Sequence, residues 1–318
     1  MPGAAPDLRT ALGGADLPNP VLTAAGCAGS GRELAQFFDI ARLGAVTTKS
    51  VMLEARAGRP APRMAETPSG MLSAVGLQGP GVDVFLQRDL PWLISRGGRA
   101  AVSVAGGTPA EYAEVAHRVE EAGGASLIEL NLSCANPADQ GRHFAVDPDA
   151  AAGVVAAVRA RLSGGVPVFA KLSPDTADIV ALAKACVQAG ADGLALINTV
   201  RGMAIDTATM RPAVAGGGGG VSGPAIRPIA LGCVYDVHAA LPDVPLIGMG
   251  GVHAGTDVLE FMLAGASAVA VGTANFHDPS ACVRILREFT EALDEHGIAR
   301  AADLVGGAHR PIGAALGR

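Results

Sequence analysis

The chain has 318 residues, of which 49% are hydrophobic and 17% charged, so it can bury a large core. Its net charge of −6 and the lack of any lysine and arginine cluster argue against a nucleic-acid partner. The length would allow two domains, but α/β barrels of this size commonly form one. We therefore expect a single domain over residues 1–318.

The five cysteines indicate a reducing compartment. The closest two, Cys186 and Cys233, are 47 positions apart, which excludes a C-x-x-C metal or redox site and argues against a disulfide framework. Residues 1–17 contain no signal-peptide core, and no apolar run reaches the roughly 18 residues of a membrane span. We therefore expect a cytoplasmic protein with no membrane association and no metal site.

Short apolar runs rich in Val, Ile, Leu and Ala alternate with longer amphipathic segments. The short runs predict strands at residues 21–25, 45–49, 100–105, 126–131, 166–172, 192–198, 244–250 and 267–272. The longer segments predict helices at residues 32–43, 82–94, 109–122, 148–162, 176–189, 224–241, 256–264 and 279–296. Eight strands alternating with eight helices favour a (β/α)8 TIM barrel over an open doubly wound sheet.

Three segments lie outside this alternation. Residues 8–10 and 15–17 flank Gly13 and Gly14, which predicts a small hairpin ahead of the barrel. Residues 51–81, rich in Gly, Pro and Met, are too long for an ordinary connection and predict a functional loop inserted after strand 2. The glycine run 216–220 predicts a mobile hinge or loop tip.

Polar side chains recur where the predicted strands end. They are Lys49 after strand 2, Ser103 near the end of strand 3, Asn131 and Cys134 after strand 4, Lys171 in strand 5, and Asn198 with Thr199 after strand 6. A lone buried lysine or cysteine is usually a packing residue. Because barrel enzymes keep their active sites at the carboxyl ends of the strands, two lysines, two asparagines and a cysteine gathered there favour a site.

Glycine turns follow the last two predicted strands, at Gly250-Gly251 and at Gly272-Thr273. In barrels the phosphate of a cofactor or substrate binds at these positions, held by backbone N–H groups that glycine allows to approach closely. The architecture therefore predicts a phosphate-bearing ligand without identifying it.

With these residues assembled, the chain resembles the catalytic subunit of class 1B dihydroorotate dehydrogenase from about Leu8 to Pro279. Each matching motif is weak alone, but their shared order is specific. The motifs are residues 69–78 (SGMLSAVGLQ), 129–134 (ELNLSC), 171–174 (KLSP), 197–199 (INT), 222–225 (SGPA), 247–252 (IGMGGV) and 271–276 (VGTANF).

The resemblance implies FMN above the barrel, with its phosphate at Gly223, Gly250-Gly251 and Gly272-Thr273. Lys49 and Lys171 would lie against the ring, where a cation favours the negative charge that develops at N1/O2 on reduction. The remaining implied cofactor contacts are Ala25, Ser50, Ser103, Asn131 and Ile197.

The resemblance also implies the substrate site and the chemistry. The implied orotate contacts are Lys49, Ser73, Ala74, Val75, Gly76, Leu77, Asn131, Asn198 and Thr199. Cys134 would take a proton from C5 of dihydroorotate while a hydride leaves C6 for flavin N5; its ordinary pKa of about 8.5 suits that task. Residues 135–146 would form a lid, in which His143 is a second acid–base candidate or simply a solvated histidine.

The chain departs from the family pattern at three positions. Ser73 and Ser103 stand where the family usually has Asn, and Ala135 replaces the proline after the catalytic Cys while Asn136 is retained. Loss of the Asn at position 73 removes an orotate hydrogen-bond donor. These departures bear on the exact substrate more than on the redox chemistry.

Class 1B enzymes pass electrons to NAD through a second subunit that carries FAD and a 2Fe–2S iron–sulfur cluster. The cysteines of this chain are too scattered to bind a cluster, and we find no strand-linked G-x-G-x-x-G. The resemblance therefore implies a separate electron-transfer partner, together with a homodimer core.

Two alternatives remain beside oxidation of dihydroorotate in pyrimidine biosynthesis. Ser73 and Ser103 leave open a related FMN-dependent oxidoreductase acting on another dihydropyrimidine or similar cyclic amide. A different class is a non-redox barrel lyase that uses Lys49 or Lys171 as a Schiff base on a phosphorylated substrate. A visible absorption spectrum separates the lyase, which is colourless, from either flavoenzyme.

Overall fold

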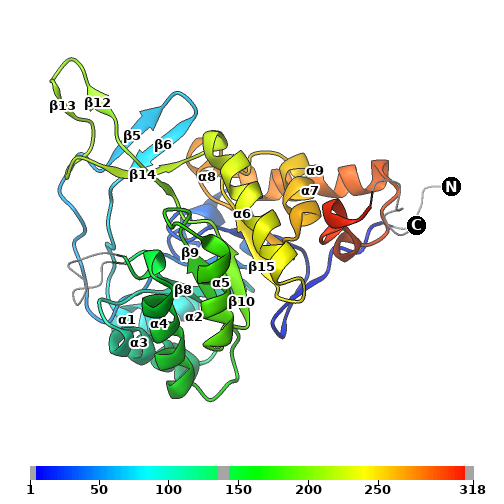
Figure 1. Cartoon of the computed structure of the whole chain (residues 1–318), viewed down its shortest axis with the longest axis horizontal. Helices are drawn as coiled ribbons and strands as arrows, with labels where there is room; N and C mark the ends of the chain where they lie inside the picture. The colour runs from blue at the N-terminus through cyan, green and yellow to red at the C-terminus, as the bar shows by residue number, and fades with distance from the viewer. Residues whose placement is uncertain (1–4, 135–142, 312–318) are drawn as a thin grey trace.

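The computed structural model describes residues 5–134 and 143–311 (Figure 1). Within these residues eight parallel strands form one sheet, and each pairs with its neighbour in chain order. They are β3 (Val21–Thr23), β4 (Val46–Thr47), β7 (Ala100–Val104), β8 (Ala125–Asn131), β9 (Val168–Leu172), β10 (Gly193–Leu196), β15 (Leu246–Met249) and β16 (Ala268–Val271). A parallel bridge between Leu22 and Ala45 joins β3 to β4. The sheet is therefore the predicted (β/α)8 barrel.

Helices follow the barrel strands and cover the outside of the sheet (Figure 1). They are α1 (Val82–Val84), α2 (Leu90–Ser95), α3 (Pro109–Ala122), α4 (Pro148–Arg161), α5 (Ile179–Gln188), α6 (Arg227–Ala240), α7 (Gly255–Ala264), α8 (Ala274–His277) and α9 (Ala281–Glu295). Thr108 and Asp147 cap α3 and α4 with side-chain oxygens that accept backbone N–H groups, and a proline follows each cap. These local signals explain why the predicted bounds of both helices are met closely.

One predicted helix, residues 32–43, is wrong. The chain forms two short 3-10 turns there, Leu34–Gln36 and Ile40–Arg42, separated by Asp39 in an extended conformation. The Asp39 carboxylate accepts the N–H of Ala41 and so begins a new turn instead of continuing the first. An aspartate that competes in this way for local N–H groups breaks a helix that the apolar spacing alone would favour.

The barrel interior is filled by side chains and closed at its amino-terminal end. Small residues such as Ala101 and Ala195 surround Phe169, and a Cβ at Gly193 would lie 2.2 Å from the Phe169 ring. The predicted hairpin forms as β1 (Thr10–Leu12) and β2 (Ala15–Leu17), and its two leucines belong to the same interior cluster. With one end plugged, the carboxyl-terminal end is left to carry polar groups.

The predicted insertion after strand 2 contains a hairpin rather than an irregular loop. Its strands β5 (Met64–Thr67) and β6 (Gly70–Ser73) join β14 (Gly219–Ser222) and β11 (Val200–Gly202) in an antiparallel sheet of order β11-β14-β6-β5. This sheet projects from the barrel, with β12 (Ile205–Asp206) and β13 (Arg211–Pro212) beyond it (Figure 1).

The prediction of a mobile hinge or tip at residues 216–220 is wrong for its second half. Gly219 and Gly220 belong to β14 and pair with β6. A Cβ at Gly219 would lie 2.4 Å from the Ser73 carbonyl oxygen, and one at Gly220 would lie 2.0 Å from Thr199 Oγ1. The glycines therefore serve close strand packing.

Two further features concern the cysteines and the helices. All five cysteines carry free thiols. Across residues 5–134 and 143–311, every helix falls short of the length and apolar character required to span a membrane.

Candidate active site

Four polar side chains predicted for the site form one continuous hydrogen-bonded chain at the carboxyl ends of the strands. Ser103 and Ser50 share a hydrogen bond of 2.9 Å, and Asn131 Nδ2 donates to Ser50 Oγ at 3.0 Å. Asn198 Nδ2 in turn donates to Asn131 Oδ1 at 3.3 Å. Because Ser103 and Asn131 lie at the ends of β7 and β8, and Ser50 and Asn198 follow β4 and β10, the network ties four barrel strands together. We call it the Ser–Asn network.

Lys171 lies inside the barrel beside an acid. It is only 5% exposed, and its Nζ is 3.6 Å from Oε1 of Glu129, which is 2% exposed. Glu129 and Asn131 are two positions apart on β8, so both face the interior. Glu129 Oε1 accepts no hydrogen bond from the described part of the chain. The lysine therefore carries its own counter-ion within the upper layer of the barrel.

Lys49 reaches from the segment after β4 to the loop that the sequence assigns to substrate. Its Nζ donates to the carbonyl oxygen of Gly76 at 3.2 Å. Burial lowers the pKa of Lys49, and the nearby Lys171 lowers it further. In the same loop Ala74 is buried, while Val75 and Leu77 are half-buried.

Ser73 and Thr199 are brought together by β14. Ser73 ends β6 and pairs with Gly220, and the Thr199 side chain packs directly against that glycine. The backbone N–H of Thr199 donates to the side chain of Asn198, at the end of the Ser–Asn network. The projecting sheet thus places the substrate loop beside the strand ends.

Cys134 is buried just beyond β8, and its thiol donates to the carbonyl oxygen of Asn131 at 3.3 Å. Burial raises the pKa of this thiol, against a hydrogen bond from Tyr112 and the positive charges of Arg56 and Lys49. The Phe144 N–H donates to the Cys134 carbonyl oxygen and helps to hold the turn. The thiol is therefore protonated at neutral pH.

Glycines and hydroxyls gather where the sequence predicts a phosphate. Gly223, Gly250 and Gly251 all have positive φ, and a Cβ on Gly251 would lie 2.9 Å from the Gly223 carbonyl oxygen. The end of β14 meets the turn after β16, because Thr273 Oγ1 donates to Ser222 Oγ at 2.8 Å. The predicted phosphate-binding residues therefore lie together at one end of the site.

The remaining predicted residues lie around the ends of the barrel strands. Ala25 is half-buried in the turn after β3, Gly272 lies between that turn and Thr273, and the Ile197 N–H donates to the Met249 carbonyl oxygen. His143 is exposed. Residues 135–142, the main part of the predicted lid, lie outside the described residues.

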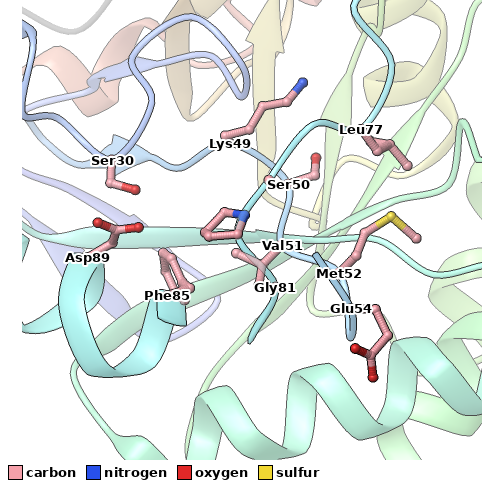
Figure 2. Close-up of a pocket in the computed structure, with 12 residues that line it drawn as sticks. Ser30, Lys49, Ser50, Val51, Met52, Glu54, Leu77, Gly81, Phe85 and Asp89 are labelled. Carbon is pink, nitrogen blue, oxygen red and sulfur yellow. The ribbon is translucent and has the colours of Figure 1, made fainter. Parts of the chain in front are cut away.

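A small cavity borders Lys49, Ser50 and Leu77, and its far wall is built by Phe85 and Asp89 (Figure 2). In Figure 2 the Lys49 side chain points away from Phe85 and Asp89. Three candidate-site residues, Lys49, Ser50 and Leu77, therefore also line this cavity.

Sequence reasoning missed Glu129, Ser222 and Tyr112. Glu129 had a readable signal, since it precedes Asn131 by one strand period, and Ser222 adjoins the predicted Gly223. Tyr112 lies on α3 and donates to the Asn131 carbonyl oxygen at 2.5 Å. Nothing in the helical pattern separates this tyrosine from an ordinary core residue.

The fold and the grouping of these residues define a (β/α)8-barrel enzyme with its site at the carboxyl ends of the strands. Comparison with known proteins then gives the family. The sequence model of the dihydroorotate dehydrogenase family matches residues 7–293, nearly the whole chain. The chain belongs to this family, as the motifs predict.

Curated relatives agree over almost their full length. The chain is 50% identical over 299 residues to the dihydroorotate dehydrogenase B (NAD(+)) catalytic subunit of Anoxybacillus flavithermus, covering 94% of this chain and 95% of the relative. It is 48% identical to the subunits of the same name from Geobacillus kaustophilus, with 94% and 95% covered, and Pelobacter propionicus, with 95% and 98% covered.

Family membership confirms the expected enzyme class, an oxidoreductase, and it implies a flavin cofactor. It favours both flavoenzyme hypotheses over the Schiff-base lyase. The roles of the individual residues stay predictions, as does the organisation of residues 1–318 as a single domain.

Proposed function

We propose that this chain is the FMN-carrying catalytic subunit of a class 1B dihydroorotate dehydrogenase and oxidises dihydroorotate to orotate. The observation that carries the proposal is the Ser–Asn network, whose member Asn131 also accepts a hydrogen bond from the Cys134 thiol through its main-chain carbonyl oxygen. Amide groups that both donate and accept suit a planar ring with alternating N–H and carbonyl groups. The names of the relatives support the same activity.

The residues present fit a flavin mononucleotide. At one end the positive-φ glycines Gly250 and Gly251, with the hydroxyls of Ser222 and Thr273, offer N–H and O–H donors to a phosphate. At the other end Lys171 is a buried cation 3.6 Å from Glu129 Oε1, an oxygen that accepts no hydrogen bond from the described residues. An ammonium held in this way retains its N–H donors for a ligand above it.

When bound, FMN supplies the acceptor for the hydride that leaves C6 of dihydroorotate. Lys171 favours the negative charge that this transfer brings to the N1/O2 edge of the ring. Cys134, as thiolate, takes the proton from C5. Asn131, Asn198 and Lys49 bind and orient the substrate so that the proton and the hydride leave from fixed directions.

We propose further that electrons leave this chain for NAD through a separate subunit with FAD and a 2Fe–2S cluster, around a homodimer of the catalytic chain. The relatives are named as NAD(+)-type catalytic subunits, which supports a partner. Within residues 5–134 and 143–311 no group of His, Cys, Asp and Glu is arranged to hold a metal ion. A cytoplasmic location stays a prediction.

A second substrate class is kept because of Ser73. The shorter Ser73 side chain offers a single hydroxyl where the family has an amide, so a differently substituted dihydropyrimidine is the alternative. Ser103 does not favour it, because its hydroxyl is fully buried and bonded to Ser50 in the network.

Anaerobic titration tests the proposal. The purified chain should be yellow with about one FMN per chain, and dihydroorotate should bleach the flavin band while other dihydropyrimidines should not. A preparation that stays colourless with added FMN would refute the flavoenzyme proposal. Faster bleaching by another dihydropyrimidine would show that this compound, and not dihydroorotate, is the substrate.

A further inference from the structure

The main-chain carbonyl oxygen of Asn131 has two side-chain neighbours that compete for it. Tyr112 Oη donates to this oxygen at 2.5 Å, and Cys134 Sγ donates to it at 3.3 Å. The tyrosine is fully buried on α3, and its ring packs edge-to-face against Phe144 with 5.8 Å between centroids. The phenol is therefore held beside the thiol by packing and not by its hydrogen bond alone.

Loss of the thiol proton changes what this arrangement needs. A neutral thiol donates to the carbonyl oxygen, whereas a thiolate has no proton to donate and accepts hydrogen bonds instead. The Tyr112 hydroxyl can rotate about its C–O bond and turn its proton from the carbonyl oxygen to the sulfur. Burial raises the pKa of Tyr112 well above its ordinary value, so the phenol remains a neutral donor while the thiol titrates.

The surroundings of the thiol agree with this exchange. Burial raises the pKa of Cys134, and the hydrogen bond from Tyr112 is the largest influence that lowers it. Among residues 5–134 and 143–311, the charged groups that face the pair are Lys49 and Arg56 from the segment after β4 and Glu111 on α3. The backbone N–H of Gly106 also favours the thiolate through a hydrogen bond, and the lysine and arginine charges favour it through space, each by less than Tyr112.

We propose that Tyr112 is a positioning residue that stabilises the thiolate of Cys134. Its hydroxyl proton bonds the Asn131 carbonyl oxygen while the thiol is protonated and turns to Sγ when the thiol has lost its proton. When Sγ takes the C5 proton of the substrate, the hydroxyl returns to the carbonyl oxygen. This inference rests on the proposed role of Cys134 as the base.

Replacement of the hydroxyl gives a direct test. The thiolate of Cys134 is followed through its ultraviolet absorbance against pH, as the difference between each protein and the same protein carrying Cys134→Ala. Tyr112→Phe should raise the midpoint by about one pH unit, or about ten-fold less thiolate at a fixed pH, the effect of one hydrogen bond to an ion. The half-exposed Tyr235 on α6 provides the control, and Tyr235→Phe should leave the midpoint unchanged.

A second measurement does not depend on the folding of that variant. The chain has only two tyrosines, so 3-fluorotyrosine incorporated into Tyr235→Phe labels position 112 alone. The more acidic fluorophenol is a stronger donor and should lower the Cys134 midpoint. Its fluorine resonance should shift with pH at that same midpoint, and the shift should vanish when Cys134→Ala is added.

The outcomes separate this inference from the proposed function. The role of Tyr112 would be overturned if the Cys134 midpoint is unchanged in Tyr112→Phe. It would also be overturned if the fluorine resonance does not shift as Cys134 titrates. Normal flavin reduction in Cys134→Ala would instead refute the role of Cys134 as the base, while the response of the phenol to the thiol titration would still be measurable. If Cys134 is the base and Tyr112 stabilises its thiolate, the pH profile of flavin reduction in Tyr112→Phe should shift to higher pH together with the thiol midpoint.

Discussion

Asn131 is the residue on which the candidate site converges. Its side chain joins Ser50 to Asn198, and its main-chain carbonyl oxygen accepts from Tyr112 and Cys134. A single position at the end of β8 therefore orients both the groups proposed to bind the substrate and the group proposed to act as base. Substitutions around it should separate these roles.

Cys134→Ala should keep its flavin spectrum but slow flavin reduction by dihydroorotate about 10²–10⁴-fold, the usual effect of losing a positioned base. In the wild type, burial raises the pKa of the thiol, so the rate should increase with pH above neutrality, as the thiolate forms. Anaerobic stopped-flow across pH measures both effects. Near-normal turnover in the alanine variant would return Cys134 to a structural role and leave His143 to be tested.

Glu129→Gln should destabilise the protein. The variant keeps the shape of the side chain but removes the counter-ion of Lys171, which is itself only 5% exposed. Breaking a buried pair in this way costs about 3 kcal/mol in the free energy of unfolding. Denaturant unfolding measures it, with Glu121→Gln on the exposed side of α3 as the matched control, where the change should stay below about 0.5 kcal/mol.

At the scale of elements, the projecting sheet determines how the substrate loop meets the barrel. Strand β14 lies between the substrate loop on β6 and the end of β10, and its glycines allow both to approach. This sheet combines the insertion after β4 with a second insertion between β10 and α6. Neither insertion can form the sheet alone, because each contributes only part of the pairing.

Gly220→Ala should therefore disturb the site from outside it. The added Cβ would lie 2.0 Å from Thr199 Oγ1, so Thr199 must move. We expect KM for dihydroorotate to rise about five-fold, the loss of one ordinary hydrogen bond, with flavin content unchanged. Gly153→Ala on α4 meets no atom within 4 Å and is the matched control. Equal KM values in the two variants would contradict a role for Thr199.

At the scale of the whole molecule, the chain is a catalytic barrel that covers most of its curated relatives' length. The relatives are named as subunits, and the chain has neither clustered cysteines nor a strand-linked dinucleotide motif. We therefore expect electron transfer to NAD to depend on another protein.

The isolated chain should reduce artificial electron acceptors with dihydroorotate but should not reduce NAD. Absorbance of NADH with and without a co-purified partner measures this, and dye reduction in the same sample confirms that the chain is active. Efficient NAD reduction by the isolated chain would show that no partner is needed.

The barrel, the hairpin below it and most of the candidate site residues could be predicted from the amino-acid sequence. These follow from short-range signals: apolar runs, helix caps such as Thr108 and Asp147, and polar groups at strand ends, which a parallel barrel must bring together. Motif order then identified the family, because several weak matches in one order are specific together.

Only the tertiary structure decided the break at Asp39, the use of Gly219 and Gly220 as strand residues, and the contact of Tyr112 with the Asn131 carbonyl oxygen. Each depends on groups far apart in the chain or on competition for one N–H group. Hydrophobic periodicity indicates which side of an element is buried, but it does not indicate which polar atom a buried side chain will contact. That information exists only once the elements are packed.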